Sequence, residues 1–466
     1  MLRGALRASS RSEAPLLSVS VCGPLTASAV AAACGFWTRV CSRWSRGSAA
    51  SGCRTSGRSH FSWRRMRTMT DDRGVPSRTE VGSAAAFGVA TPAEAQQCGP
   101  PGKGRVESSA DRAAGNMAAV ATTQAQIEKV QPLRLKNGKY WNPWSSWTGL
   151  PTLVDFIKLW WNERGKWIYT DEIPEEYERH LPVKTPDLEV LCTAPKPGVL
   201  RSTWLGHSTV LVQFEQGFTV ITDPVFSERC SPVQWFGVKR YRPAPCTAAQ
   251  LPHIDAVLIS HNHYDHLDLL SVRAIETKFS PAFYVPQGLK SWLVKNVPGL
   301  DSQRVHELGW WEETFQRKND KEFKIVFTPA QHWGSRALLD NCRALWGSWV
   351  VAGPTKKFFF AGDSGYCPVF TSVGALYGPF DLSAIPIGAY EPHYFFRQQH
   401  VNPEEAVQMH VDLRSRRSLG IHWGTFKLTM EHYMEPRERM LSASGKAGLE
   451  KNAFFTLTHG EHLDVE

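Results

Sequence analysis

The stretch that decides the fold runs from an apolar strand into a turn dense with imidazole and carboxylate groups: Ile259-Ser260-His261-Asn262-His263-Tyr264-Asp265-His266-Leu267-Asp268. The apolar run 256–259 predicts a buried strand before the turn, and a helical pattern follows it. Histidine and aspartate are natural ligands of zinc in proteins. A solvated polar turn is the alternative interpretation, and we disfavour it because matching ligand types recur downstream.

The spacing within this motif favours two metal ions over one. His261 and His263 are two residues apart, so they share one face of an extended strand end. Asp265 and His266 lie on the turn beyond and point elsewhere. Four ligands within six residues cannot all reach one ion without strain. We therefore expect two adjacent zinc ions per chain, with one pair of these side chains on each.

Three further ligands are expected at strand ends later in the chain. His332, Asp363 and His422 each follow a short apolar run, and Gly362 permits a tight turn before the aspartate. Loops at the strand ends of a sheet are where an α/β site is usually built. Taken singly, each of these residues could instead be a packing residue, because lone histidines are common in protein interiors.

Short β runs alternate with helical segments through the rest of the domain. Eight runs predict strands, at 209–214, 218–222, 256–260, 323–328, 348–352, 357–361, 382–387 and 454–458. Helices are predicted at 269–278, 403–412 and 437–443, and Asn402 followed by Pro403 is typical of a helix start. Two successive groups of strands along the chain, each accompanied by helices, predict an α/β fold of the αβ/βα sandwich type.

The first 135 residues differ in composition from the rest. Residues 1–70 carry 11 Arg, no Lys and one acid, Glu13, and have a net charge of +10, whereas residues 117–466 are neutral. The charge of the body therefore gives no reason to expect a nucleic-acid partner.

The Arg-, Ser- and Ala-rich profile of residues 1–70 is typical of a transit peptide, here to mitochondria. A disordered basic arm and an extension that is not always translated are the alternatives. Residues 71–135 are interpreted as a low-complexity linker.

Tryptophan is concentrated at the start of the domain that we expect over 136–466. Leu153, Phe156, Ile157 and Trp160 recur at helical spacing there. Rings of this kind favour a membrane interface, and the alternative is that they pack on the body of the domain. The region holds six tryptophans: Trp141, Trp144, Trp147, Trp160, Trp161 and Trp167.

The pattern of ligands resembles the metallo-β-lactamase superfamily. More closely, from about residue 136 to about 460, it resembles the N-acyl-phosphatidylethanolamine-hydrolysing phospholipases D. The motifs that carry this resemblance are Trp204-Leu205-Gly206-His207, Thr222-Asp223-Pro224, the His261 motif quoted above, Gln331-His332-Trp333, Gly362-Asp363-Ser364-Gly365-Tyr366, Pro386-Ile387-Gly388-Ala389-Tyr390-Glu391-Pro392 and Ile421-His422-Trp423-Gly424-Thr425-Phe426.

The resemblance implies a division of labour among these residues. His261, His263 and His332 would hold one zinc, and Asp265, His266 and His422 the other. Asp363 would bridge the two ions, which makes Asp265 and Asp363 the expected catalytic carboxylates, and Tyr264 and His400 would contact the phospholipid. The resemblance also implies a bile acid near the site entrance, but Ser335 and Lys427 depart from the residues that we expect there.

The expected activity is that of a zinc-dependent phospholipase D acting on N-acyl-phosphatidylethanolamine, with an N-acylethanolamine and phosphatidic acid as products. Two adjacent zinc ions would activate a water and hold phosphate oxygens. The expected partner is a membrane phospholipid, met by peripheral membrane association. The sequence leaves the oligomeric state open, a homodimer included. The alternatives are another hydrolase of the same fold, such as a lactonase or a non-lipid phosphodiesterase, and a non-catalytic membrane scaffold that retains zinc.

Overall fold

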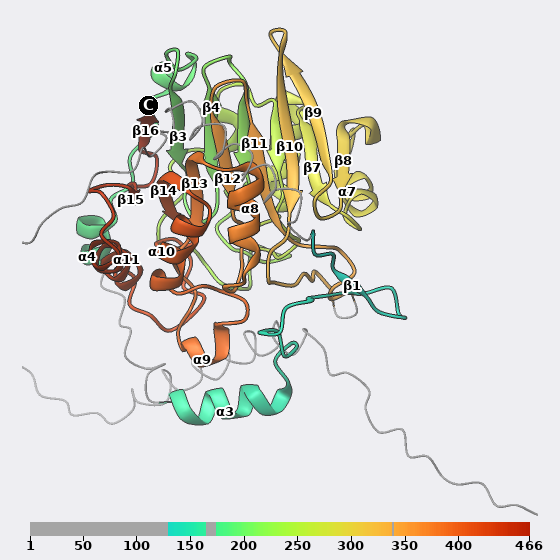
Figure 1. The fold of residues 1–466 in the computed structure, drawn as a ribbon, viewed down its shortest axis with the longest axis vertical. Helices are drawn as coiled ribbons and strands as arrows, with labels where there is room; N and C mark the ends of the chain where they lie inside the picture. Colours follow the sequence, from blue (N-terminus) through green and yellow to red (C-terminus); the bar gives the residue numbers. More distant parts are fainter. Residues whose placement is uncertain (1–128, 165–173, 338–339) are drawn as a thin grey trace, which may run out of the picture. The chain divides into compact units, whose positions relative to one another are not determined.

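Two stacked β-sheets with helices on their outer faces form the body of the protein (Figure 1). The computed structural model describes residues 129–164, 174–337 and 340–466. The predicted transit-like stretch and most of the predicted linker lie outside these residues. The arrangement confirms the α/β sandwich that the sequence predicts.

The first sheet has seven strands in the order β16-β3-β4-β5-β6-β7-β8. From β5 to β8 the strands are parallel, and helices α6 (Leu269–Phe279) and α7 (Lys290–Asn296) connect them. The strand β16, from the far end of the chain, pairs antiparallel with β3. The strands are β3 (Leu200–Trp204), β4 (Val210–Phe214), β5 (Thr219–Thr222), β6 (Ala256–Leu258), β7 (Ala282–Pro286), β8 (Val305–Leu308) and β16 (His462–Val465).

The second sheet also has seven strands, in the order β15-β14-β13-β12-β11-β10-β9. Its strands are β9 (Glu313–Lys318), β10 (Lys321–Thr328), β11 (Ser348–Ala352), β12 (Lys357–Phe360), β13 (Phe380–Pro386), β14 (Ser415–Ile421) and β15 (Phe454–Phe455). Its helices are α8 (Val369–Tyr377), α10 (Pro403–Asp412) and α11 (Glu435–Lys446). The expected start of α10 is confirmed, because the Asn402 side chain accepts a hydrogen bond from Glu405 N.

Alternating side chains of the strands fill two apolar layers. In β4, Val210 and Val212 belong to the large core between the sheets, together with Phe327 and Phe358. Leu211 points the other way, into the layer beneath α6. This period-2 pattern fixes the register of each strand, since a slip by one residue would exchange its two faces.

The metal-binding motif is a loop and not the strand end that the sequence predicts. The strand β6 ends at Leu258, and residues 259–268 form a turn that leads into α6. The strand β6 stops at this point because of a side chain at the end of β5. Asp223 accepts the backbone N–H of Ser260 at 2.7 Å, which replaces the next rung of the β ladder.

The Trp-rich region divides into a packed part and an exposed part. A short hairpin, β1 (Leu133–Arg134) with β2 (Tyr140–Trp141), begins the described chain. Next to it, Trp147 is buried and Trp144 stacks on Trp310. Trp167 lies outside the described residues. Three short helices complete the fold: α4 (Pro174–His180), α5 (Leu188–Leu191) and α9 (His393–Phe396).

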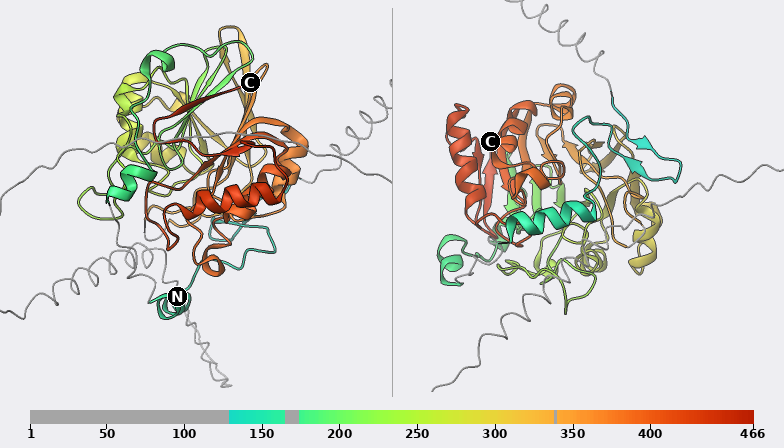
Figure 2. Two further views of the ribbon diagram at one scale, coloured as in Figure 1. Left: turned by 90° about the vertical axis from the view of Figure 1, so that its left-hand side faces the viewer. Right: turned by 90° about the horizontal axis from the view of Figure 1, so that it is seen from below.

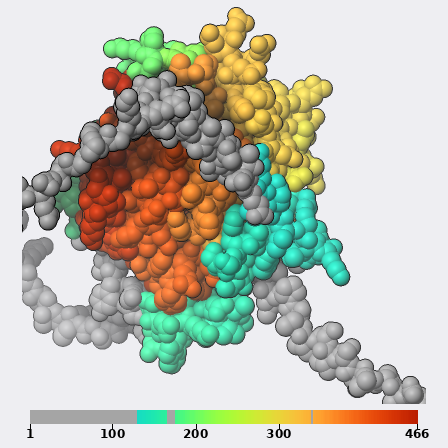
Figure 3. Space-filling model, in the orientation of Figure 1, coloured from blue at the N-terminus to red at the C-terminus, as the bar shows by residue number. Residues whose placement is uncertain are grey.

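The predicted helix at 153–160 is present as α3 (Leu153–Glu163), which Figure 2 shows as a ribbon, and Thr152 caps it. In the space-filling view, α3 lies at the lower edge of the described residues (Figure 3). It lies beside α9, where Phe156 and Phe395 meet edge to face at 5.3 Å. Trp161 is 62% exposed and Trp160 43% exposed. Part of the region therefore packs on the body of the domain, and contact with a membrane stays a prediction for the exposed rings. Over the residues described, no helix has the length and apolar character of a membrane span.

Candidate metal centre

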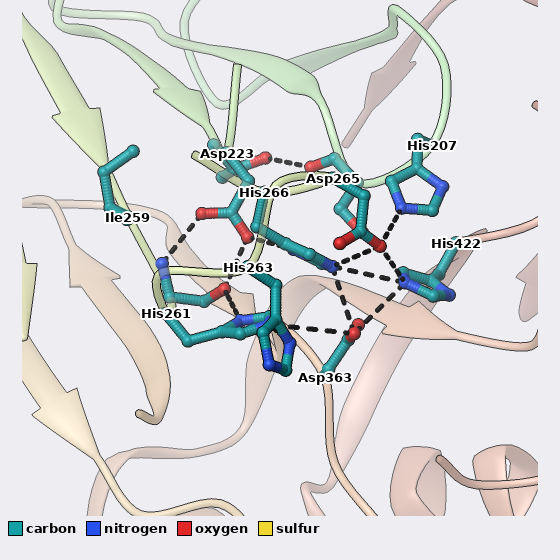
Figure 4. A network of polar contacts seen from close by, with 12 residues as sticks. His207, Asp223, Ile259, His261, His263, Asp265, His266, Asp363 and His422 are labelled. Carbon is teal, nitrogen blue, oxygen red and sulfur yellow. Dashed lines mark hydrogen bonds and ion pairs between the residues drawn. The ribbon is translucent and has the colours of Figure 1, made fainter. Parts of the chain in front are cut away.

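The seven imidazole and carboxylate side chains that the sequence predicts as ligands lie together where the loops of the two sheets meet. Figure 4 shows six of them: His261, His263, Asp265, His266, Asp363 and His422. Three of the seven form a first group with only nitrogen atoms facing inward. His263 Nδ1 lies 2.9 Å from His261 Nε2 and 3.3 Å from His332 Nε2. All three rings are buried or nearly so.

A second group lies beside the first. His266 Nε2 is 3.2 Å from His422 Nε2, and Asp265 Oδ2 is 3.4 Å and 3.5 Å from these two nitrogens. His266 and His422 come from different sheets, so this group joins the two halves of the sandwich. Its members are the residues that the sequence expects on the second ion.

Asp363 lies between the groups, as expected of a bridging ligand. Its Oδ2 is 3.0 Å from His266 Nε2 and 3.1 Å from His422 Nε2. The same oxygen is 3.8 Å from His332 Nε2 and 3.9 Å from His261 Nε2. One carboxylate thus reaches both groups.

These separations fit metal ligation. Ligand nitrogens about 2.0–2.1 Å from a tetrahedral zinc lie about 3.3 Å from one another. A shared proton satisfies one pair of nitrogens, whereas a cation satisfies all of them at once. One buried carboxylate oxygen of the cluster, Asp363 Oδ1, has no hydrogen-bond partner among the described residues. The donor set of imidazole and carboxylate therefore suits one or two divalent ions.

The carboxylates set the electrostatics of the second group. Burial alone lowers the pKa of an imidazole, but Asp363 and Asp265 outweigh it at His266, whose pKa lies well above its usual range. The same balance raises the pKa of His422 to about 9. Burial prevails at His261 and His332, and their pKa values lie well below the usual range. The second group thus holds protons that a metal ion must displace.

Two side chains that the sequence analysis left without a role hold the second group in place. Asp223 Oδ2 lies 2.6 Å from His266 Nδ1, which turns Nε2 of that ring toward the centre. His207 Nε2 lies 3.0 Å from Asp265 Oδ2. Partners of this kind orient metal ligands and fix the histidine tautomer. Both residues stand in motifs that carry the family resemblance, which is the only signal that the sequence offers.

The first group is held in place by a backbone carbonyl and by a side chain next to the N-terminal hairpin. His332 Nδ1 lies 3.0 Å from the Gln399 carbonyl, so its Nε2 faces the site. Asn142, just after β2, donates its side-chain N–H to the His332 carbonyl at 2.7 Å. The hairpin therefore supports a residue of the metal centre 190 positions away.

Unusual backbone geometry positions two of the three expected ligands that follow strands of the second sheet, Asp363 and His422. Gly362 has a φ of 61°, and a Cβ there would come within 2.5 Å of the Ser260 Cβ. Glycine is required by both the left-handed conformation and this close approach, as the sequence predicts. His422 itself has a φ of 61°. Left-handed geometry at a non-glycine residue is strained and is often found at functional sites.

The two residues expected to contact substrate lie in different surroundings. His400 borders the centre, with Nδ1 3.8 Å from Asp363 Oδ2, and burial lowers its pKa to about 4. Tyr264 donates its hydroxyl to the Arg336 carbonyl at 2.7 Å. The position of His400 beside the ligands suits contact with a bound anion. The hydroxyl of Tyr264 is already engaged within the protein.

Comparisons with known proteins place the chain in a family of lipid hydrolases. The model of the beta-lactamase superfamily domain matches residues 219–423. An "N-acyl-phosphatidylethanolamine-hydrolyzing phospholipase D 1" of Caenorhabditis elegans is 41% identical, over 72% of this chain and 94% of its own. A yeast protein of the same name, marked mitochondrial, is 38% identical over 51% of this chain and 50% of its own. The solved structure of Igni18, a metallo hydrolase of Ignicoccus hospitalis, aligns with a TM-score of 0.41 and 18% identity, over 57% of this chain and 99% of that one.

Proposed function

We propose that this chain, which belongs to the family of N-acyl-phosphatidylethanolamine-hydrolyzing phospholipases D, is itself a zinc-dependent phospholipase D. Its substrate would be N-acyl-phosphatidylethanolamine, and its products an N-acylethanolamine and phosphatidic acid. The observation that carries the proposal is the position of Asp363 Oδ2 between two groups of ligands. A pair of metal ions bridged by one carboxylate is suited to cleaving a phosphodiester.

When bound, two zinc ions supply an activated water, whose pKa falls to about 7, and positive charge for the phosphate oxygens. The protein's own residues provide the geometry. Asp363 keeps the two ligand groups at a fixed separation, and Asp223 and His207 fix His266 and Asp265. His400, neutral because its pKa is lowered, offers a ring nitrogen beside Asp363 for a phosphate oxygen or the leaving group. The bond between phosphorus and the ethanolamine oxygen breaks, that oxygen leaves with the N-acylethanolamine, and phosphorus gains an oxygen from water.

The substrate has three acyl chains, two on its glycerol and one on its ethanolamine nitrogen, and stays in the bilayer, so the site must come to the membrane. The exposed apolar side chains of α3 provide a contact surface, because Ile157 and Trp161 are more than half exposed. The Arg164 guanidinium lies over the Trp161 ring at 4.1 Å. With that ring in the membrane interface, this cation would meet the lipid headgroups. We infer that α3 adsorbs to the membrane beside the metal centre.

Product analysis tests this function directly. Purified full-length protein is incubated with N-acyl-phosphatidylethanolamine in phosphatidylcholine vesicles, and the products are quantified by mass spectrometry. We expect equal amounts of N-acylethanolamine and phosphatidic acid, loss of both after chelation, and recovery with Zn²⁺. In H₂¹⁸O the label should enter phosphatidic acid only. Zinc-loaded protein that cleaves no phosphodiester would support the scaffold alternative.

A further inference from the structure

The segment 263–266, which carries three of the seven expected ligands, is closed by one arginine from another loop. Arg336 follows His332 in the connection between β10 and β11. Its Nη1 donates to the carbonyl of Leu267 at 2.7 Å and to that of Asn262 at 3.2 Å. These two carbonyls flank residues 263–266. A single guanidinium thus ties together the two ends of the ligand-bearing turn.

Aromatic rings hold the same guanidinium from two sides. It lies over the Tyr264 ring at 4.2 Å and over the Trp292 ring at 4.5 Å. Tyr264 also donates its hydroxyl to the Arg336 carbonyl, so these two residues hold each other. Trp292 belongs to α7. The turn is therefore fastened through Arg336 to a helix of the first sheet.

The loop around Arg336 is itself braced. Asp340 Oδ1 accepts the backbone N–H of Arg336 at 2.9 Å and the hydroxyl of Ser335 at the same distance. Within the described residues, no carboxylate lies at ion-pair distance from the guanidinium, so its hydrogen bonds go to backbone carbonyls. Burial lowers its pKa to about 10, and it remains charged at neutral pH.

We propose that Arg336 is a positioning residue for the metal centre, which sets the curvature of the turn and thereby aligns His263, Asp265 and His266. This inference rests on the proposed metal-binding function. The planar guanidinium is essential to it. Arginine can stack between two rings while it donates in its own plane, and a lysine ammonium keeps the charge but cannot do both.

The test compares Arg336→Lys with a matched control, Arg273→Lys. Arg273 also donates to a backbone carbonyl, that of Asn296 at 2.6 Å and 2.9 Å, but it lies in α6. Affinity for metal is measured by competition with a chelator, and coordination geometry by the visible absorption of the Co²⁺-loaded protein. We expect Arg336→Lys to lose about 10- to 100-fold in metal affinity, with an altered Co²⁺ spectrum. Arg273→Lys should keep the wild-type affinity and spectrum.

A second variant covers the case in which Arg336→Lys does not fold. Trp292→Leu removes one ring and leaves both carbonyl contacts, so it should change the Co²⁺ spectrum in the same direction by less. A wild-type spectrum and affinity in Arg336→Lys, or equal losses in Arg273→Lys, would overturn the proposal. Neither readout depends on turnover. A wild-type protein that binds metal but yields no N-acylethanolamine would refute the proposed function and leave the role of Arg336 measurable.

Discussion

The metal centre buries charged and polar side chains, whereas α3 exposes apolar ones, so the two regions depart from the usual pattern of burial in opposite directions. At the centre, Asp363 and His266 are almost completely buried, although charged and polar side chains favour the surface. On α3, Ile157 and Trp161 are more than half exposed, although large apolar side chains favour the interior. Each departure has a cost in stability, which a ligand can offset. In the proposed function, that ligand is a cation at the centre and a bilayer at α3.

The two regions also differ in how firmly they are held. Three rings of the centre are fixed through their second ring nitrogen: His261 by Ser260, His266 by Asp223 and His332 by the Gln399 carbonyl. The helix α3 is attached through Phe156, Leu159 and the contact of Glu163 with the Tyr394 hydroxyl at 3.3 Å. We therefore expect substitutions at the centre to abolish chemistry, and substitutions on α3 to change where that chemistry takes place.

The largest effect is expected from Asp363→Asn. The wild-type protein should carry close to two zinc ions per chain. The variant should lose metal from both groups and lose activity by at least about 100-fold, the upper end of the cost of removing a residue that only orients a ligand. Elemental analysis and product assays measure the two losses.

Asp381→Asn is the control for Asp363→Asn, because Asp381 is also buried but contacts Lys356 and Arg416 instead. Active protein with one ion or none would contradict the dinuclear centre.

A smaller effect is expected from Trp160→Ser combined with Trp161→Ser. Each ring contributes about 1.5–3 kcal/mol when fully buried, so vesicle binding should fall by about tenfold or more. Activity on detergent-dispersed substrate should be retained. Vesicle sedimentation beside a melting curve separates the alternatives. Parallel loss of thermal stability and of both activities would mean that these rings are part of the packing.

Two single substitutions on α3 refine the comparison within one helix. Leu159 is 5% exposed and Ile157 is 56% exposed. Leu159→Ala should destabilise the protein by about 2–5 kcal/mol. Ile157→Ala should change stability by less than about 0.5 kcal/mol and weaken vesicle binding by roughly tenfold or less. Urea unfolding and sedimentation measure the two quantities, and equal effects of the two variants would show that α3 has no separate membrane face.

No effect on catalysis is expected when residues 1–116 are deleted. The supporting contact of Asn142 with His332 lies well beyond that deletion, as does the hydrogen bond from Trp311 to the Val130 carbonyl. Removal of residues 1–150 is the contrasting truncation, and it should lower metal affinity. Failure of the shorter deletion to fold would show that the predicted linker is part of the domain. A reporter fused to residues 1–70 tests the predicted targeting separately, and a diffuse cytosolic signal would argue against it.

The sequence could predict which side chains meet at the centre because their chemistry is visible in residue types. His332, Asp363 and His422 each follow an apolar run, and strand ends of one sheet meet at one edge. The path of the turn could not be predicted in the same way. It depends on Asp223, which takes the N–H of Ser260 from 37 positions away. Asn142 and Arg336 donate to backbone carbonyls, and no local sequence pattern indicates such contacts.

The helix α3 shows a second limit of sequence patterns. The spacing of Leu153 and Ile157 predicts a helix, and the helix is present. The same spacing usually marks the buried face, but here the described body covers Leu159 and leaves Leu153 and Ile157 exposed. A periodic apolar stripe records that a face avoids water. It does not record whether protein or lipid covers that face.

The pairing of β16 with β3 has a consequence for how the protein is made. The first sheet is completed by residues 462–465, and Arg201 in β3 forms an ion pair with Asp464 at 2.7 Å. A ribosome synthesises β3 early and β16 only after the whole second sheet. During that interval β3 has an open edge that can pair with another chain. Until residues 462–465 emerge, the nascent chain therefore carries an unpaired strand edge, and we expect a tag fused directly after β16 to interfere with folding more than one placed before β1.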